Sequence, residues 1–254
     1  MLLYRNAVQH NQQQAGKQLK MTPKSDHGIQ VIRRSVAILR LLGLSQTFLS
    51  LGQIAHRCAL PRSTVQRIVA TLVDEGLVIA NAHGDGFSLG PQAYVLASQQ
   101  RNEAWRQYQP NLARLASKTG ETVDLAVLQK TDMLFIDQVP GSHRLRAVSE
   151  PGQRFSALKT ANGRACLSML TNKELTQRFG VDDAFLDMMQ EVRDTGLAWD
   201  IDEHMLGISA VGAAFKGTDG QLYAISIPVP SQRFNRVKSE LAKLLTATLQ
   251  TVGA

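Results

Sequence analysis

The stretch PRSTVQRIVATL, residues 61–72, constrains the fold of this chain most, because its two edges differ sharply in chemistry. Apolar side chains recur at spacings of three and four, at Val65, Ile68, Val69 and Leu72. This spacing predicts an amphipathic helix, and Pro61 suits its start because proline presets φ and lacks an N–H that would go unused. The other edge carries arginine, serine and glutamine without an acid. We therefore predict a helix with one edge in a core and the other facing a separate partner.

A second, shorter helix is predicted just before it. Ser50 followed three residues later by Gln53 fits a capping box, in which each residue bonds the backbone of the other. Leu51, Ile54 and Ala55 supply its apolar side, and the helix should end near Cys58. An earlier helix is indicated by Ile32, Val36 and Leu39, with Gly43 as its stop. The segment at about 50–70 is therefore expected to be a helix-turn-helix.

A β-hairpin is expected after the second helix of this motif. LVIA at 77–80 and FSL at 87–89 have strand character, and the turn-rich NAHGDG separates them. A helix-turn-helix followed by a hairpin, the wing, is the layout of a winged helix domain, here predicted for residues 28–91 with its wing at about 77–89.

Positive charge is concentrated at one end of the chain. Residues 1–73 hold ten basic side chains and one acidic side chain, a net charge of +9, whereas residues 74–254 carry a net −2 within a total of +7. A local excess of this size suits a polyanion such as DNA, although a solvated basic surface is the plain alternative.

The predicted DNA contacts follow from side-chain chemistry. Arginine reaches phosphate or guanine, glutamine pairs with adenine, and hydroxyl groups in a first helical turn lie beside backbone N–H groups that face phosphate. His83 in the wing adds a pH-sensitive phosphate contact or is a solvated surface histidine. The predicted set is Arg33, Arg34, Arg62, Ser63, Thr64, Gln66, Arg67 and His83.

Composition limits the other classes of protein. With 44% hydrophobic and 19% charged residues, the chain can bury a sizeable core, and no apolar run approaches a membrane span of roughly 20 residues. No secretion signal is evident, so we expect a cytoplasmic protein without membrane contact. Cys58 and Cys166 are read as buried apolar residues rather than as a disulfide or metal site. Residues 1–27 read as a disordered arm, and Met21 is an alternative start.

The second half predicts a different architecture. A polar linker helix is expected at 92–107, anchored by Val95, Leu96 and Trp105, as a connector or a dimer seam. Beyond it, in a domain at 108–254, we expect a short helix, paired strands at 121–128 and 133–139, helices between 162 and 194, strands GISAVGAAFK and LYAISIPV, and a closing helix from 235. Adjacent strand pairs without a βαβ rhythm indicate an antiparallel α+β fold.

The sequence resembles the IclR-type bacterial transcription regulators over about residues 28–250. The matching segments are GIQVIRRSVAIL, LSLGQIAHRCALPRSTVQRIVATLVDEGLV, GFSLG, TANGRACLSML, GLAWDIDEHMLGISAVGAAF and AISIPVPSQRF. The resemblance implies a winged helix domain joined by a helix to a GAF-like effector domain, whose small-molecule ligand changes affinity for a pseudo-palindromic operator. It also implies a homodimer or homotetramer and no cofactor.

The resemblance further implies an effector site. Its residues would be Asn162, Gly163, Asp200, Ile208, Ala210, Ser226 and Pro228. Residues two apart on a strand share a face, as one pocket wall requires. Members that bind small carboxylates tend to place a cysteine and a second serine where this chain has Ala210 and Pro228, which offer no side-chain donor. We therefore expect an apolar or aromatic effector, as for the efflux-pump repressors of the family, and repression as the mode of action.

Two other classes of function remain open on sequence alone. Asp200, Glu203 and His204 could form a metal site or an acid–base pair, although DEH more often orients a strand or loop, and Cys166 with His143 could suggest a thiol nucleophile. A protein–protein adaptor using the winged helix is the third reading. We expect no catalytic activity.

Overall fold

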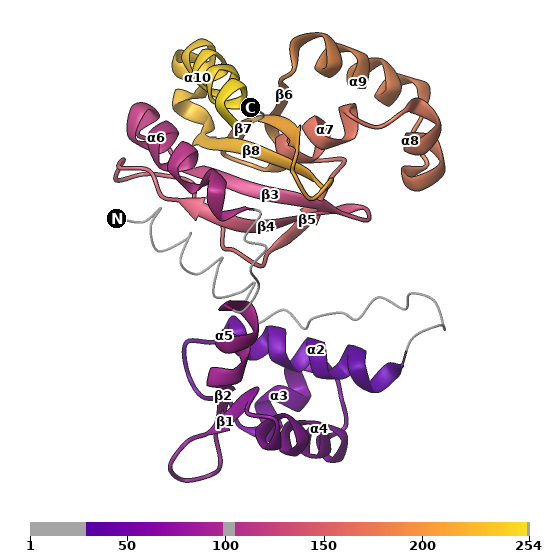
Figure 1. The fold of residues 1–254 in the computed structure, drawn as a ribbon, viewed down its shortest axis with the longest axis vertical. Helices are drawn as coiled ribbons and strands as arrows, with labels where there is room; N and C mark the ends of the chain where they lie inside the picture. The colour runs from indigo at the N-terminus through magenta and orange to yellow at the C-terminus, as the bar shows by residue number, and fades with distance from the viewer. Residues whose placement is uncertain (1–28, 99–104, 253–254) are drawn as a thin grey trace. The chain divides into compact units, whose positions relative to one another are not determined.

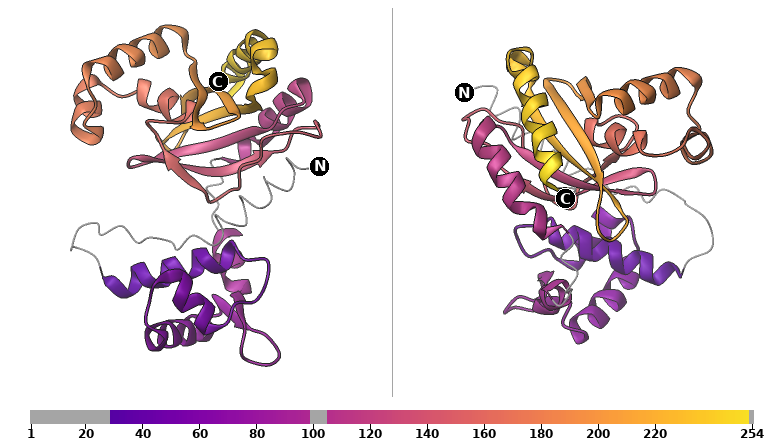
Figure 2. Two further views of the ribbon diagram at one scale, coloured as in Figure 1. Left: turned by 180° about the vertical axis from the view of Figure 1, so that it is seen from behind. Right: turned by 45° about the horizontal axis from the view of Figure 1, so that its top comes forward.

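The computed structural model describes residues 29–98 and 105–252, and Figures 1 and 2 show its ribbon. The chain divides into two compact units, residues 1–102 and 103–254. The predicted arm at 1–27 lies outside the described residues, and so does the middle of the predicted linker helix. The described parts of that linker are α5 (Pro91–Ser98) and the single 3₁₀ turn η1 (Arg106–Tyr108).

The first unit is a winged helix-turn-helix. Before α5 its elements are α2 (Gln30–Gly43), α3 (Leu51–Cys58), α4 (Arg62–Asp74), β1 (Val78–Ala80) and β2 (Phe87–Leu89). The three helices enclose one apolar core, in which Ile38, Ile54 and Val65 have no exposed surface. The strands are antiparallel, and Leu49 adds a bridge to Phe87 beside them. The predicted order of helices and hairpin is confirmed.

The helix-turn-helix forms for local reasons that the sequence shows. The Ser50 hydroxyl accepts from the Gln53 N–H at 3.3 Å, and Gln53 Oε1 accepts from the Ser50 N–H at 2.8 Å, so the capping box is complete. One detail of the prediction is wrong: Pro61 is the N-cap of α4, with ψ of 137°, and the helix begins at Arg62. The extended ψ that ends the turn from α3 keeps Pro61 outside the helix.

The second unit is a six-stranded antiparallel sheet with helices on both faces. Its elements after η1 are α6 (Gln109–Thr119), β3 (Val123–Gln129), β4 (Asp132–Val139), β5 (Arg154–Ser156), α7 (Ala161–Ser168), α8 (Asn172–Phe179), α9 (Asp183–Thr195), β6 (Ala198–Met205), β7 (Ile208–Lys216), β8 (Leu222–Pro230) and α10 (Ser231–Val252). The strand order is β5-β4-β3-β8-β7-β6. The expected antiparallel α+β class is therefore confirmed.

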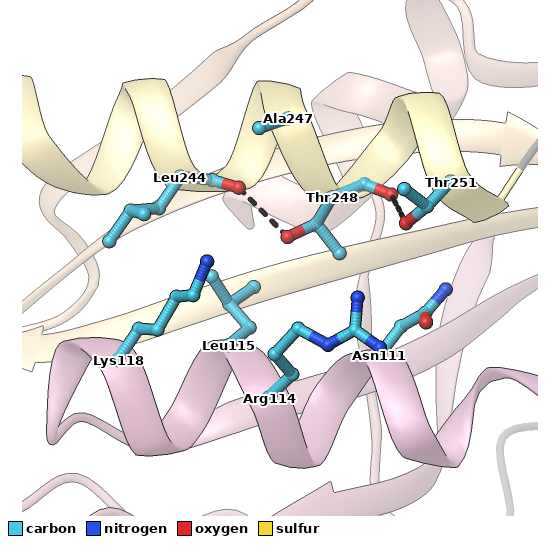
Figure 3. A pocket seen from close by; sticks show the side chains of 8 residues that line it. All are labelled: Asn111, Arg114, Leu115, Lys118, Leu244, Ala247, Thr248 and Thr251. Atoms are coloured by element: carbon cyan, nitrogen blue, oxygen red, sulfur yellow. Dashed lines mark hydrogen bonds between the residues drawn. The ribbon is translucent and has the colours of Figure 1, made fainter.

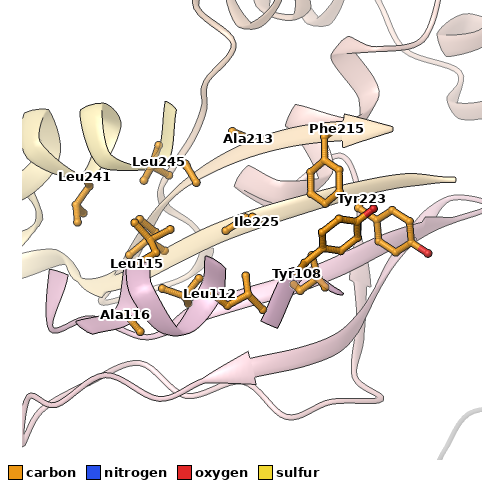
Figure 4. Close-up of a cluster of buried hydrophobic side chains, with 14 of the residues drawn as sticks. Tyr108, Leu112, Leu115, Ala116, Ala213, Phe215, Tyr223, Ile225, Leu241 and Leu245 are labelled. Atoms are coloured by element: carbon orange, nitrogen blue, oxygen red, sulfur yellow. The ribbon is translucent and has the colours of Figure 1, made fainter. Parts of the chain in front are cut away.

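Helices α6 and α10 cover one face of this sheet, and α7, α8 and α9 lie on the other (Figure 1). Figure 4 shows the apolar side chains of α6 and α10 packed on β7 and β8. At one end of this core Tyr108 meets Phe215 edge-on, with ring centroids 4.7 Å apart, and lies 5.9 Å from the Tyr223 ring. Residue 108 is thus docked where the linker enters the second unit.

Two expectations for this unit need correction. Strand β6 was not predicted, because Asp200, Asp202 and Glu203 interrupt any apolar alternation and Asp202 has a φ of +58° at a break in the register with β7. Helix α10 begins at Ser231, four residues before the expected start, directly after β8. Its early start lets Arg233 donate both to Glu121 Oε1 at 2.6 Å and to Oε2 at 2.7 Å, which ties the helix to the sheet.

Helix α7 sits against the sheet at a position that only glycine leaves open. A Cβ on Gly212 of β7 would lie 2.6 Å from the Ala161 carbonyl carbon and 2.7 Å from the Asn162 nitrogen. Backbone atoms cannot move aside as a flexible side chain can, so Gly212 permits the close approach of the α7 N-terminus. This approach brings Asn162 to the sheet.

Candidate functional site

The polar edge of α4 is exposed, as the amphipathic pattern predicts. Val65, Ile68, Val69 and Leu72 are buried against the core. Arg62, Ser63, Gln66 and Arg67 are exposed on the outside, and Thr64 is half-buried beside them. Two guanidinium groups, a hydroxyl and an amide therefore share one accessible helix surface, a donor-rich arrangement that can reach phosphates and base edges in a major groove.

The wing owes its shape to Asn81, a residue that the sequence reading passed over. Its Oδ1 accepts from the N–H groups of Asp85 and Gly86, and its Nδ2 donates to Asp85 Oδ1 at 2.9 Å. The Asn81 N–H also donates to the Gly86 carbonyl at 2.8 Å. An asparagine at the start of a turn-rich segment was the available signal. These bonds hold His83 exposed in the loop.

The remaining predicted DNA contacts lie on another helix. Arg33 is exposed and Arg34 half-buried on α2, so they are not part of the α4 surface itself. His56 is exposed on α3, and His27 lies outside the described residues. The candidate surface with the closest grouping of predicted contacts is therefore α4.

The predicted effector residues lie together on the α7 face of the sheet in the second unit. Across the strands, Asp200 pairs with Ala210 and Ala210 with Pro228, and one row further on Gly212 pairs with Ser226. Ile208 precedes Ala210 by two residues on β7 and so lies on the same face of the sheet. Asn162 and Gly163 are in the first turn of α7, and Asn162 Nδ2 donates to Ser226 Oγ at 3.4 Å. The register thus places these residues next to one another, and their role in binding stays a prediction.

A buried carboxyl group that the sequence reading missed extends this row. Asp124 of β3 pairs with Ser226 and accepts, through Oδ1, from Gln138 Nε2 at 2.8 Å and from Ser149 Oγ at 2.6 Å. Its side chain faces α7 like that of Ser226. A single acid within the apolar run of β3 was the signal that could have revealed it. Burial raises the pKa of Asp124 to about 6.

Asp124→Asn should stabilise the protein in a pH-dependent way. The folded pKa lies above the ordinary aspartate pKa of 3.8, so the folded state holds its proton to higher pH and stability falls as the pH rises from about 4 to 6. Asparagine can still accept both hydrogen bonds and has no charge to bury. We expect a gain of up to about 3 kcal/mol at pH 7.5 that shrinks toward zero at pH 4, in urea unfolding at both values. A gain of equal size at both pH values would contradict this account.

The residues proposed for a metal-dependent enzyme are engaged in structural bonds. Asp200 Oδ1 accepts from the N–H groups of Glu203 and His204, and Glu203 binds Arg164 through two hydrogen bonds of 2.7 and 2.5 Å. The His204 ring packs edge-on against Phe155 with centroids 4.5 Å apart. Burial raises the pKa of Asp200, and the bond from Arg164 lowers the pKa of Glu203. Within the described residues no three His, Cys, Asp or Glu side chains are grouped to hold a metal ion.

The proposed thiol nucleophile is also unsuited to that role. Cys166, a residue of α7, is fully buried in the apolar core between that helix and the sheet, and burial raises the pKa of its thiol. His143 approaches Glu121 at 3.6 Å instead. A thiolate is needed for attack, so this environment favours a structural cysteine.

A groove of about 220 Å³ lies between α6 and α10, on the other face of the sheet from Asn162 (Figure 3). Arg114 and Lys118 extend over it from α6. On the α10 side Thr248 donates to the Leu244 carbonyl at 2.8 Å, and Thr251 donates to the Thr248 carbonyl at 2.7 Å. These hydroxyls are used by the helix itself, and the groove contains none of the predicted effector residues.

In the described part of the chain, no helix has the length and apolar character of a membrane span.

Comparison with known proteins bears on both units. A family model described as the C-terminal domain of the bacterial transcriptional regulator IclR matches residues 97–254, and another, the IclR helix-turn-helix domain, matches residues 31–80. The HTH-type transcriptional regulator Rv1719 of Mycobacterium tuberculosis is 38% identical over 239 residues, covering 89% of this chain and 92% of that protein. The HTH-type transcriptional regulator TtgV of Pseudomonas putida is 34% identical over 229 residues, covering 86% and 88%.

A solved structure agrees with the fold. The IclR-type transcriptional regulator from Alicyclobacillus acidocaldarius superimposes with a TM-score of 0.75 at 22% identity, covering 89% of this chain and 98% of that one. The matched relatives are regulators rather than enzymes. Because the C-terminal family model matches more than half of the chain and Rv1719 is 38% identical over 89% of it, this chain belongs to the IclR family of bacterial transcriptional regulators.

Proposed function

We propose that this regulator is a repressor that occupies a pseudo-palindromic operator through α4 and the wing, and that a small molecule bound in the second unit releases it. The exposed edge of α4 is the observation that carries the proposal, because Arg62, Gln66 and Arg67 project from one rigid helix with no acid between them. As a DNA-binding regulator of a bacterial family, the protein is expected to work in the cytoplasm.

The effector is expected to be largely apolar or aromatic. Ala210 and Pro228 face each other across β7 and β8 in the predicted site, and neither offers a side-chain hydrogen-bond donor. A small carboxylate would lose its hydration there without receiving donors from these two positions, and that loss is costly. The lack of donors at these two positions resembles the efflux-pump repressors of the family, and repression is proposed on that likeness.

A homodimer is proposed from the outer surface of α2. Ile29, Ile32 and Val36 are all exposed, and their spacing places them on one side of that helix. An exposed apolar stripe of this kind is typical of a protein interface, and a second copy of the chain would bury it by twofold symmetry. Two winged helices would then meet two half-sites of a pseudo-palindrome. A tetramer remains a prediction from the family resemblance.

The double variant Ile32→Glu, Val36→Glu should weaken this dimer. It would bring four like charges together across a twofold interface, so we expect at least a tenfold rise in the dimer dissociation constant by analytical ultracentrifugation. Gln46→Glu adds an exposed charge outside α2 and serves as the control. An unchanged dissociation constant in the double variant would place the dimer contact elsewhere.

The proposed function is tested by fluorescence anisotropy with DNA from upstream of the gene and a scrambled duplex of equal length, at two salt concentrations. We expect a clear preference for the upstream DNA and a steep loss of affinity with salt. Equal and weak binding of both duplexes, with and without candidate ligands, would favour the adaptor function instead.

A further inference from the structure

Asn162 has an unsatisfied hydrogen-bond acceptor deep in the second unit. Its side chain is 2% exposed, and its Oδ1 has no hydrogen-bond partner among the described residues. An unpaired buried oxygen of this kind costs free energy, and most buried polar atoms in proteins have a partner. This oxygen therefore needs a donor that the described residues do not supply, and a bound ligand can provide one.

The hydroxyl of Ser226, next to Asn162, has a proton without an acceptor within the residues that the structure describes. It is 4% exposed, and its Oγ accepts from Asn162 Nδ2 at 3.4 Å. Among the hydrogen bonds of the described residues, the Ser226 hydroxyl donates to none, so its proton is available to a ligand acceptor. An acceptor on Asn162 and a donor on Ser226 thus lie side by side.

The charges around this pair disfavour an anion. Asp124 pairs with Ser226 across β3 and β8, and Asp200 lies one row away, both buried. Arg164 is the only basic side chain that is buried among the described residues, and Glu203 already binds it in bidentate fashion. A carboxylate entering here would meet two buried acids and the Asn162 oxygen, without a free cation.

We propose that the effector carries a neutral hydroxyl group, which donates to Asn162 Oδ1 and accepts from Ser226 Oγ. A hydroxyl is both donor and acceptor, and so satisfies both side chains at once. A carboxylate cannot donate, an ammonium group cannot accept, and a hydrocarbon does neither. This inference rests on the proposed role of the same site in regulation and adds the polar group that an otherwise apolar effector bears.

We expect the ligand to reach the pair by displacing residues 145–149, in the middle of the segment 141–153 between β4 and β5. This segment has no helix or strand, and Ser149 and Ala147 close it over the sheet by bonds to Asp124 and Thr122, each 2.6 Å long. Displacing residues 145–149 costs these two bonds, a bond from Gln138 Nε2 to Ser149 Oγ at 2.7 Å and a bond from Arg233 to the Leu145 carbonyl at 2.8 Å. It breaks none of the pairs of the six-stranded sheet. The effector domain can therefore admit a ligand with its six-stranded sheet intact.

Four ligands of matched shape test the assignment: p-cresol, p-toluate, p-xylene and p-toluidine, titrated calorimetrically into the full-length protein at pH 7.5. We expect p-cresol to bind roughly ten- to a hundredfold more tightly than p-toluate or p-xylene, because these leave the buried polar atoms unpaired. It should also bind more tightly than p-toluidine, whose amino group is neutral at pH 7.5 and donates a hydrogen bond but accepts one poorly. Tighter or equal binding of any of the other three, or no binding by p-cresol, would overturn the assignment.

The variant Ser226→Ala distinguishes the proposed hydrogen bond to the ligand hydroxyl from the contribution of burying the ligand's apolar surface. It should lower p-cresol affinity about five- to tenfold while leaving that of p-xylene unchanged. The matched control is Ser209→Ala, which removes a buried serine of β7 that bonds Ser231 at 2.9 Å instead. Its p-cresol affinity should equal that of the wild type. An equal loss in both variants would count against the proposed bond.

DNA release is measured separately, by anisotropy on the operator with and without p-cresol. If p-cresol binds as expected but leaves operator affinity unchanged, the hydroxyl assignment is supported and regulation through this site is refuted. If p-cresol does not bind but the operator is recognised, the hydroxyl assignment fails and the DNA-binding function stands.

Discussion

Gly212→Ala is expected to destabilise the second unit by about 3 kcal/mol or more. The added Cβ would lie 2.6 to 2.8 Å from three backbone atoms of Ala161 and Asn162. Helix α7 would have to lift from the sheet, and the buried pair of Asn162 and Ser226 would separate with it. Both tryptophans of the chain, Trp105 and Trp199, belong to this unit, so their fluorescence during urea unfolding reports its stability.

Gly180→Ala is the matched control in the same unit. Gly180 has a φ of +63° at the end of α8, and a Cβ there would meet no atom within 4 Å. Its alanine variant should be destabilised by only about 1 kcal/mol, the conformational cost of a non-glycine residue in the left-handed region. If Gly212→Ala cost no more than this control, the close packing of α7 on β7 would be wrong. Ligand binding should also be lost in Gly212→Ala under conditions where it remains folded.

Removing both arginines from α4 should have the second large effect. For Arg62→Ala, Arg67→Ala we expect operator affinity to fall roughly a hundred- to a thousandfold, because each good arginine contact to a base or phosphate contributes about 1 to 3 kcal/mol. Both side chains are exposed on the helix surface, so folding should be unaffected. Anisotropy on the operator measures the loss, and circular dichroism checks the fold.

The control for charge is Arg40→Ala, an exposed arginine in the last turn of α2. It lowers the charge of the same unit without altering α4, so its effect should be small and equal on operator and scrambled DNA. The single α4 variants divide the two roles: a base contact loses preference for the operator, whereas a phosphate contact lowers the salt dependence by about one counterion. Undiminished operator binding by the double variant would mean that α4 is not the recognition helix.

The first unit was largely predictable because its signals are local. The capping box of Ser50 and Gln53, the spacing along α4 and the turn residues of the wing each act within a few neighbours, and the structure contains all three features. The position of Pro61 was off by one residue, since helix boundaries depend on the approach of the preceding chain as well as on propensity.

The second unit was harder to predict because its stabilising contacts are distant in sequence. Arg164 meets Glu203 39 positions later, and Glu121 meets Arg233 112 positions later. Strand β6 exists because β7 pairs with it, not because its own residues favour a strand. Asp124 looked like an interruption of an apolar run, and only the sheet register shows that it lies beside Ser226. The predicted effector residues rest on family resemblance alone, and the register brings them onto one face of the sheet.

The docking of Tyr108 gives the second unit a mechanical property. Strands β7 and β8 pair without a register shift from Ile208 and Pro230 to Lys216 and Leu222. One part of this hairpin bears Ala210 and Pro228, and another bears Phe215 and Tyr223, on which Tyr108 rests. An unbroken ladder resists sliding, so the two strands form a stiff connection between the row of predicted effector residues and the point where the linker arrives. We therefore expect a displacement of Ala210 to reach the Tyr108 ring, because the strands between them cannot slide past each other to absorb it.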